Sequence, residues 1–524
     1  MSKKINREPS AVQLGFERGL RIGALIVGLY HLLMGIYRYY DEFSGTTLEY
    51  MDFVLFGALA LATASYLVFT KMEYPDTMYR VKDFVRGLLR PEMLLLMALL
   101  GWYVISCLAC GSYYQGPWLR GNAFPLLDTA INVFIFFPLA AYMPQERRRQ
   151  AVHGVIHVFV GLLTVLMMIV LWNVYQLNIL HVPGGEIGMS ENVRLYINCN
   201  PNTTGAFAAL LVMLCLYMVV SERPLIKALY GFALFVHMVI LMLSNSRTCL
   251  IAVTAAFMLV AFVFVWHRLA KPGLVRRIVI CALASVLTLL AMTSIRSAVF
   301  ASFESITHFS ELVALQKEAE KSEAAISSAA DAVSEAAAES TADASAAIER
   351  SGANAAADIT LKAESIGTRL VTWGHAMKAM VYNLHMAIFG VTPISVIGAL
   401  DLGAGEAINT AYTHNQFLEI GVSLGFPGLF LFLAFLVLTA RNCLVIVFSR
   451  EQRPFPGFYV IPATIFMLVV SNLLEAILLF YHYPNGSFFY ILCGWVALES
   501  HALPNPFRRK APSARAKAGK KKSR

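Results

Sequence analysis

The side chains best suited to chemistry in this chain stand at the edge of an apolar run. The stretch "AYTHNQFLEIGVSLGFPG", residues 411–428, places His414 and Asn415 just before the run and Glu419 one helical turn further on. An imidazole exchanges a proton close to neutral pH, so His414 is a candidate general base. Asn415 and Glu419 are candidates to orient it through hydrogen bonds. The plainer interpretation is that a single histidine at such an edge packs against its neighbours.

Three arginines stand in similar settings. Arg194 lies in "NVRLYINCNPNTTGAF", Arg247 in "LSNSRTCLIA" and Arg369 in "TRLVTWGHAMKAM". A guanidinium remains charged and grips phosphate oxygens through a planar fork, so each arginine is a candidate anion ligand. Each also has a plainer role: Arg247 could anchor a helix end, Arg194 could be a solvated loop charge, and Arg369 could pair with an acidic residue. Trp373 fits an interfacial anchor better than a substrate-stacking residue.

These residues are set in a strongly hydrophobic chain. Its 524 residues are 58% hydrophobic and 14% charged, with a mean hydropathy of +0.62. Soluble domains hold about a quarter charged residues, so the composition indicates an integral membrane protein. The sequence predicts an all-α protein with about twelve transmembrane helices and a large helical extracytoplasmic loop. The predicted helices lie at about 19–37, 50–70, 92–110, 124–143, 151–172, 204–220, 225–243, 248–266, 278–295, 416–440, 457–480 and 485–500.

The net charge of +9 is unevenly distributed along the chain. Lys and Arg are concentrated in alternate loops, as in residues 71–90, 147–149, 268–277 and 441–453. Cytoplasmic loops carry such an excess, so both termini are predicted to face the cytoplasm, with no cleaved signal peptide. The basic tail, residues 501–524, is predicted to lie on anionic lipid rather than to bind nucleic acid. The eight cysteines show neither a zinc nor a disulfide framework.

This topology divides the chain into five parts and places His414 at the outer membrane surface. The external loop contains an insert rich in Ala, Ser and Glu, residues 311–365, which is predicted either as a helical hairpin or as a disordered acidic segment. The parts are transmembrane helices one to five (1–190), helices six to nine with the Arg-bearing external edges (191–295), the extracytoplasmic loop (296–414), helices ten to twelve (415–500) and the cytoplasmic tail (501–524).

Four motifs taken together resemble the bacterial O-antigen ligase and O-antigen polymerase family. They are "RLYINCNPN", "NSRT", "TRLVTWGHAM" followed by "IFGV", and "HNQFLEIGVSLGFPG". The family pattern has an Arg ahead of Pro-Asn, a Ser-Arg at a helix start, and an Arg-x-x-x-Trp helix before a Gly-rich turn. It ends in His-Asn ahead of a helix broken by Gly-x-x-Gly, here Gly425 and Gly428. Two features differ from the family: the Ala-rich insert, and "FGVTPIS" in place of Gly-Val-Gly.

The resemblance implies a multi-pass enzyme of the bacterial inner membrane, with its active site facing the periplasm or the cell exterior. Such enzymes transfer a glycan from polyprenyl (undecaprenyl) diphosphate to an acceptor hydroxyl, which belongs to lipid A-core for a ligase or to a growing glycan for a polymerase. His414 would be the catalytic base. No Asp/His cluster has metal-ligand spacing, so the reaction is predicted to need no metal and no other cofactor. Substrate-binding residues would be Arg194 and Arg247 on the diphosphate, with Arg369, Asn415 and Glu419.

Two alternatives to a ligase stay open. A polymerase of O-antigen, capsule or wall glycan shares the motifs, although the long external loop favours a ligase. A flippase for lipid-linked glycans is compatible with polar residues of the membrane interior such as His157, His237 and Glu475. Against a flippase, no repeat relates the two halves, and the charges gather at one surface. The expected partners are the lipid-linked donor, a lipid or glycan acceptor, and membrane lipids.

Overall fold

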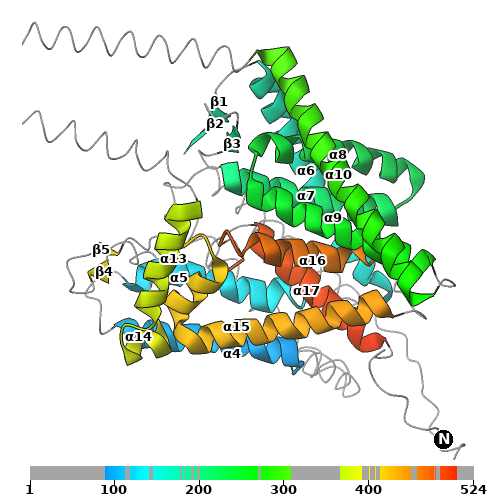
Figure 1. The fold of residues 1–524 in the computed structure, drawn as a ribbon. Helices are drawn as coiled ribbons and strands as arrows, with labels where there is room; N and C mark the ends of the chain where they lie inside the picture. Colours follow the sequence, from blue (N-terminus) through cyan, green and yellow to red (C-terminus); the bar gives the residue numbers. More distant parts are fainter. Residues whose placement is uncertain are drawn as a thin grey trace, which may run out of the picture.

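The computed structural model is dominated by packed helices in the part of the chain that it describes (Figure 1). The predicted helices at 19–37 and 50–70, the Ala-rich insert and the basic tail from residue 504 onward lie outside the described residues. Those residues are 89–111, 118–140, 145–176, 180–182, 185–190, 194–197, 201–269, 273–308, 366–391, 400–401, 407–408, 413–449, 457–476, 478–479 and 484–503.

Seven helices of the described part are long and apolar enough to cross a membrane. An α-helix rises about 1.5 Å per residue, so about 20 apolar residues cover the hydrocarbon core of a bilayer. The chain is therefore a multi-pass helical membrane protein, and these seven correspond to seven of the twelve predicted helices. They are α4 (Pro91–Gly111), α6 (Gln145–Tyr175), α7 (Pro201–Ser221), α8 (Pro224–Ser244), α9 (Arg247–Arg268), α10 (Leu274–Thr307) and α15 (Gln416–Phe448).

Two further predicted helices are present, and one of them is interrupted. The predicted helix at 124–143 is split between α5 (Trp118–Ile131) and a π-helical segment (Asn132–Phe136), and it contains Pro125. The predicted helix at 485–500 is α17 (Pro484–Ala502), which is buried along nearly its whole length.

The predicted helix at 457–480 ends early. α16 (Val460–Ser471) has only 12 residues, and the chain leaves the helix at Asn472. The Asn472 side chain donates to the Leu468 carbonyl oxygen, so it occupies one of the last helical carbonyl groups. The polar residues that follow lie in a non-helical turn rather than inside a membrane-spanning helix.

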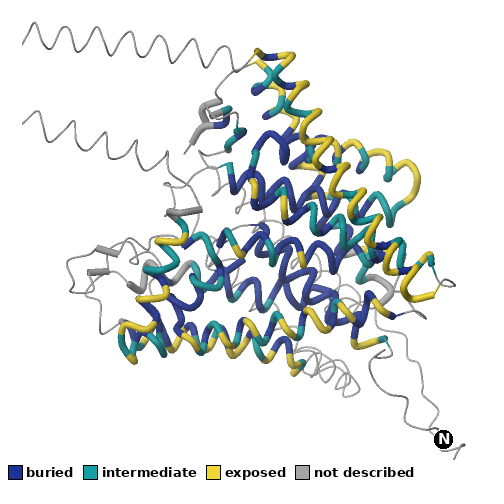
Figure 2. Tube along the Cα trace, viewed as in Figure 1, coloured by how far each residue is buried: buried dark blue, intermediate teal, exposed yellow. Residues whose placement is uncertain are grey.

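α7 is enclosed by protein, whereas α10 is mostly exposed (Figure 2). In the apolar 18-residue stretch of α7, 83% is buried inside the protein, whereas in the corresponding stretch of α10 only 11% is buried. α7 packs against α8, α9, α16 and α17, and a helix that is apolar all round fits such a central place. α10 packs mainly on α9 and leaves side chains such as Leu283 and Leu287 exposed. A contiguous exposed apolar face of this kind fits contact with lipid.

A tight joint of two glycines holds α15 against α14 (Leu384–Phe389). Gly390 and Gly425 have positive φ angles of 73° and 68°. A Cβ at Gly390 would lie 2.3 Å from the carbonyl carbon of Ser423, and one at Gly425 would lie 2.2 Å from the carbonyl oxygen of Ile388. Glycine alone accepts both this backbone conformation and this close approach. The Gly-x-x-Gly break in the sequence is therefore the point where α15 docks on α14.

Two small antiparallel sheets stand among the helices, although the sequence predicts only helices and loops. In the first sheet, Ser190 pairs with Arg194, which fixes the segment that carries this arginine. In addition, α10 continues to Thr307, past residue 296 where the external loop was predicted to begin. The strands are β1 (Leu180–Val182), β2 (Gly185–Ser190) and β3 (Arg194–Ile197) in one sheet, and β4 (Leu400–Asp401) and β5 (Ala407–Ile408) in the other.

Candidate active site

The candidate site lies where several helices begin, at one end of the bundle that we call the site end. The Cys249 thiol near the start of α9 donates to the carbonyl oxygen of Asn202 at the start of α7, at 3.7 Å. The first backbone N–H of α15, that of Gln416, donates to the Asn472 carbonyl oxygen at 3.0 Å in the turn after α16. Helix N-termini present unpaired N–H groups and partial positive charge, so this end of the bundle favours an anion.

The start of α15 fixes the backbone that carries His414. This residue has a φ of 51°, a left-handed conformation that is uncommon outside glycine and is often found at functional sites. Asn415 caps the helix, because its Oδ1 accepts from the N–H groups of Phe417 and Leu418 at 3.0 and 3.1 Å. Its Nδ2 donates to the Leu473 carbonyl oxygen at 2.9 Å and so ties the cap to the turn after α16.

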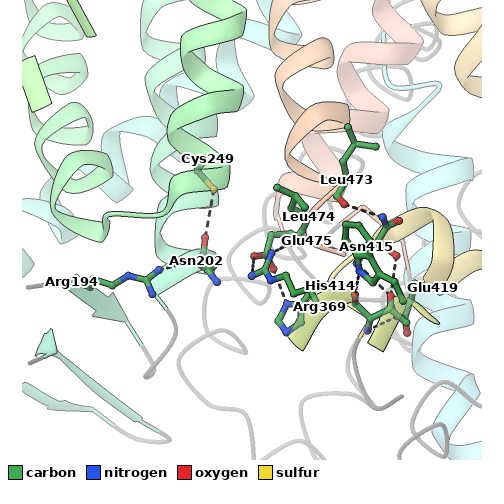
Figure 3. Close-up of polar contacts among 12 residues, drawn as sticks. Arg194, Asn202, Cys249, Arg369, His414, Asn415, Glu419, Leu473, Leu474 and Glu475 are labelled. Atoms are coloured by element: carbon green, nitrogen blue, oxygen red, sulfur yellow. Dashed lines mark hydrogen bonds and ion pairs between the residues drawn. The ribbon is translucent and has the colours of Figure 1, made fainter. Parts of the chain in front are cut away.

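Glu475, in that turn, joins His414 to Arg369 (Figure 3). One carboxylate oxygen lies 3.4 Å from Nδ1 of His414, and the other lies 3.3 Å from a guanidinium nitrogen of Arg369. Arg369 also donates to the Leu474 carbonyl oxygen at 2.6 Å. The Glu475 side chain is 4% exposed and needs a compensating charge, which Arg369 supplies. His414 is 22% exposed, so it is the most accessible of the three side chains.

Glu419 and Trp373 both hold the residue before His414. The buried Glu419 carboxylate accepts from the Thr413 hydroxyl at 2.7 Å and from its N–H at 3.2 Å. Trp373 lies on α13 (Ile366–Met380) and donates from Nε1 to the Thr413 carbonyl oxygen at 2.8 Å. Thr413 is thus tied to both α13 and α15. Trp373 therefore has a positioning contact that the interfacial-anchor interpretation did not include.

Gln416 links α15 to the chain beyond Glu475. Its side-chain oxygen accepts from the N–H groups of Leu478 and Leu479 at 2.9 and 3.1 Å. Its own N–H contacts the Glu475 carbonyl oxygen at 3.2 Å as well as that of Asn472. These bonds hold the turn after α16 against the start of α15, which keeps Glu475 beside His414.

Arg194 reaches from β3 to the beginning of α7. Its guanidinium donates to Oδ1 of Asn202 at 2.7 Å, and its Nε donates to the Ser244 carbonyl oxygen at 3.3 Å. Asn202 also accepts the Cys249 thiol through its backbone. One corner of the site end is thus built from β3, α7, α8 and α9.

The Arg194 corner and the Glu475 group lie beside each other (Figure 3). Arg194, Arg369 and Glu475 are all near enough to the buried Cys249 thiol to act on it electrostatically. Arg247, the first residue of α9, is exposed at the same end of the bundle. Three arginines and a histidine therefore lie at the same end of the bundle as two buried glutamates, Glu475 and Glu419, and among these described residues the arginines outnumber the acids.

Sequence reasoning located Arg194, Arg369 and His414, and the structure brings these three into one region. Asn415 and Glu419 act on the backbone around His414, through the helix cap and through Thr413, so their predicted orienting role takes an indirect form. Glu475 was missed because an unbroken helix would have placed it in the membrane interior. The available signal was the polar pair Ser471–Asn472 ahead of an acid in an otherwise apolar segment.

Part of the sequence matches the model of a known family. Residues 232–433 match the family model described as O-antigen ligase. This stretch of the chain is similar to the O-antigen ligase family. The O-antigen ligase match begins in α8 and ends in α15, so it includes Arg247, Arg369 and His414, while Arg194 and Glu475 lie outside it. A search of curated proteins finds no significant match to the chain.

Proposed function

We propose that this chain is a membrane glycosyltransferase that moves a glycan from polyprenyl diphosphate to an acceptor hydroxyl. The observation that carries the proposal is the ion-paired group of His414, Glu475 and Arg369 beside Arg194, at the N-terminal ends of several helices. Such a site offers one proton acceptor and several positive charges, which are the two needs of the reaction. The similarity of residues 232–433 to the O-antigen ligase family supports a lipid-linked glycan as substrate.

The proposed step is a single displacement at the anomeric carbon. The acceptor oxygen attacks this carbon, the bond between the carbon and the diphosphate oxygen breaks, and polyprenyl diphosphate leaves with the bonding electrons. The acceptor proton passes to Nε2 of His414, because Nδ1 faces the Glu475 carboxylate. The carboxylate stabilises the imidazolium that forms, as an acid does in other base–acid pairs.

Arginines would stabilise the charge that develops on the leaving diphosphate. Arg194 and Arg369 are held by hydrogen bonds to Asn202 and Glu475, so they need little reorganisation when charge appears. The exposed Arg247 would bind the same group from the start of α9. Charge stabilisation by arginine in this way requires no metal, in line with the predicted reaction.

We place the site end at the periplasmic or external face of the bacterial inner membrane, and we favour ligation to lipid A-core over polymerisation. The distribution of basic loops supports this orientation. The long segment between α10 and α15 supports a ligase, because an external loop beside the site can select the acceptor.

The test uses purified protein in lipid, a polyprenyl-diphosphate-linked glycan, and either lipid A-core or a second glycan as acceptor. Release of polyprenyl diphosphate is followed for the native chain and for His414→Ala and Arg247→Ala. Matched controls are His501→Ala and Arg223→Ala, which change the same residue types at the opposite end of the bundle. We expect His414→Ala to lower the rate by about 10²–10⁴-fold and the controls to match the native rate.

Each outcome has a defined meaning. Release that depends on lipid A-core supports a ligase, while release that depends on the second glycan supports a polymerase. Movement of the lipid-linked glycan across the bilayer without release would identify a flippase and overturn the proposal. Release that persists in His414→Ala would remove this histidine from the reaction.

A further inference from the structure

A second polar cluster lies at the end of the bundle opposite the site end. His153 and His157 are one turn apart on α6, and Glu222 directly follows α7. One nitrogen of each imidazole and one carboxylate oxygen of Glu222 lie within 4.8 Å of one another. Nδ1 of His153 lies only 2.5 Å from the Glu222 carboxylate, so the imidazole and the carboxylate face each other.

Each imidazole of this cluster is oriented by a tyrosine. The Tyr217 hydroxyl lies 2.6 Å from Nε2 of His153, and the Tyr230 hydroxyl lies 2.6 Å from Nδ1 of His157. Histidines that bind metals usually have their second ring nitrogen held in this manner, because the contact fixes the tautomer and the ring plane. The tyrosines come from α7 and α8, so three helices shape the cluster.

We propose that His153, His157 and Glu222 form a binding site for a transition-metal ion of the zinc class. His153 would coordinate through Nδ1 and His157 through Nε2, since the tyrosines occupy the other nitrogens. Two imidazoles, one carboxylate and a water molecule make a common four-coordinate zinc set. His153 is buried, but the Glu222 side chain is 15% exposed, so an ion can reach the cluster from solvent.

The identity of the ion follows from the donors and from the neighbouring charge. Arg149 donates to the Ser221 carbonyl oxygen, next to Glu222, and its positive charge opposes a cation held by weak bonds. Magnesium and calcium ions prefer sites made of oxygen atoms, whereas imidazole nitrogen suits zinc, cobalt, copper and nickel ions. The cluster is therefore expected to bind zinc or cobalt and to exclude magnesium and calcium.

The site would clamp α6 to the connection between α7 and α8. The sequence does not reveal it, because His153 and His157 lie on a different helix from Glu222 and meet it only in the fold. The sequence led us to expect no Asp/His cluster with metal-ligand spacing, whereas the fold brings together two histidines and a glutamate. The cluster stands apart from the proposed diphosphate site.

The experiment titrates the purified, metal-free full chain in detergent with Co²⁺, whose visible absorption reports four-coordinate binding. The native chain should bind about one equivalent, Zn²⁺ should displace it, and Mg²⁺ should not. His157→Gln and Glu222→Gln should lose the signal. His501→Gln, a histidine elsewhere at the same end, should retain it. The same titration should raise the melting temperature of the native chain but not of Glu222→Gln.

Tyr230→Phe separates a metal site from a merely structural network. This change leaves all three proposed ligands and should weaken Co²⁺ binding by about 10-fold, because the His157 ring loses its orienting contact. Absence of Co²⁺ absorption in the folded native chain would overturn the proposal. So would an equal signal in the native chain and in Glu222→Gln.

Discussion

Both ends of the bundle pair a histidine with a glutamate, but different neighbours surround each pair. At the site end, Arg369 bonds to the carboxylate of Glu475 that faces His414. At the opposite end, tyrosine hydroxyls hold His153 and His157. Within the described residues, no arginine bonds to the carboxylate of Glu222.

The neighbours decide which kind of ligand each pair favours. Arg369 neutralises Glu475, so the charges of Arg194 and Arg247 at the same end favour an anion such as diphosphate. At the opposite end, Arg149 bonds to the Ser221 carbonyl oxygen instead of the Glu222 carboxylate, so the carboxylate and the imidazole lone pairs can favour a cation. The same two residue types therefore favour an anion at one end and a cation at the other. Substitutions at each end test the two sites separately.

After His414→Ala, the largest effect is expected for Glu475→Gln. The change keeps the shape of the side chain but removes the charge that pairs with both Arg369 and His414. The imidazolium formed on His414 then lacks its stabilising carboxylate, so the rate of glycan transfer should fall by about 10²–10³-fold, which corresponds to about 3–4 kcal/mol. The readout is kcat in the polyprenyl diphosphate release assay, and Glu475→Asp should recover part of it.

The same variant tests whether the two ends of the bundle act independently. Glu475→Gln should bind Co²⁺ at the opposite end as the native chain does. If Glu475→Gln lost both glycan transfer and Co²⁺ binding, the two losses would reflect a disturbed fold and not the loss of one separate site.

A second prediction concerns the joint that supports the site end. Gly425→Ala places a Cβ against the Ile388 carbonyl group in a left-handed backbone conformation. It should destabilise the chain by about 2–3 kcal/mol, measured by thermal unfolding in detergent. Gly101→Ala on α4 is the control, because nothing lies within 4 Å of its Cβ position. Equal melting temperatures would show that the joint contributes nothing.

Smaller effects are expected for the anion-binding arginines taken singly. Arg194→Ala and Arg369→Ala should each raise KM for the lipid-linked donor by about 10-fold, because each removes one charged partner of the diphosphate. Arg369→Ala should also lower kcat, since Glu475 then loses its partner, whereas Arg194→Ala should act mainly on KM. The exposed Arg223→Ala is the control. Unchanged KM in both variants would place the diphosphate elsewhere.

The smallest effect is expected for Trp373→Phe. This change removes only the hydrogen bond to the Thr413 carbonyl oxygen, worth about 1 kcal/mol. The release rate should fall by about 3- to 5-fold, with the melting temperature nearly unchanged. A loss as large as that of His414→Ala would mean that Trp373 contacts the substrate itself.

The sequence by itself determined the class of the protein. Long apolar stretches require helices in a bilayer, because no water is present there to bond with unpaired backbone groups. Basic residues in alternate loops predicted an orientation, and local motifs such as His414–Asn415 and Gly425–Gly428 indicated the resemblance to the O-antigen ligase family, whose model matches residues 232–433. Each of these signals depends on residues that are close together in the chain.

Only the tertiary structure decided which distant residues meet. Glu475 joined the site because α16 ends early, at Ser471, and the turn that follows docks on Gln416. His153 and Glu222 meet because α6 packs beside the connection of α7 and α8. Such contacts depend on where helices end and on how they pack. Hydrophobic periodicity specifies neither, because it describes one segment and carries no information about the element that packs against it.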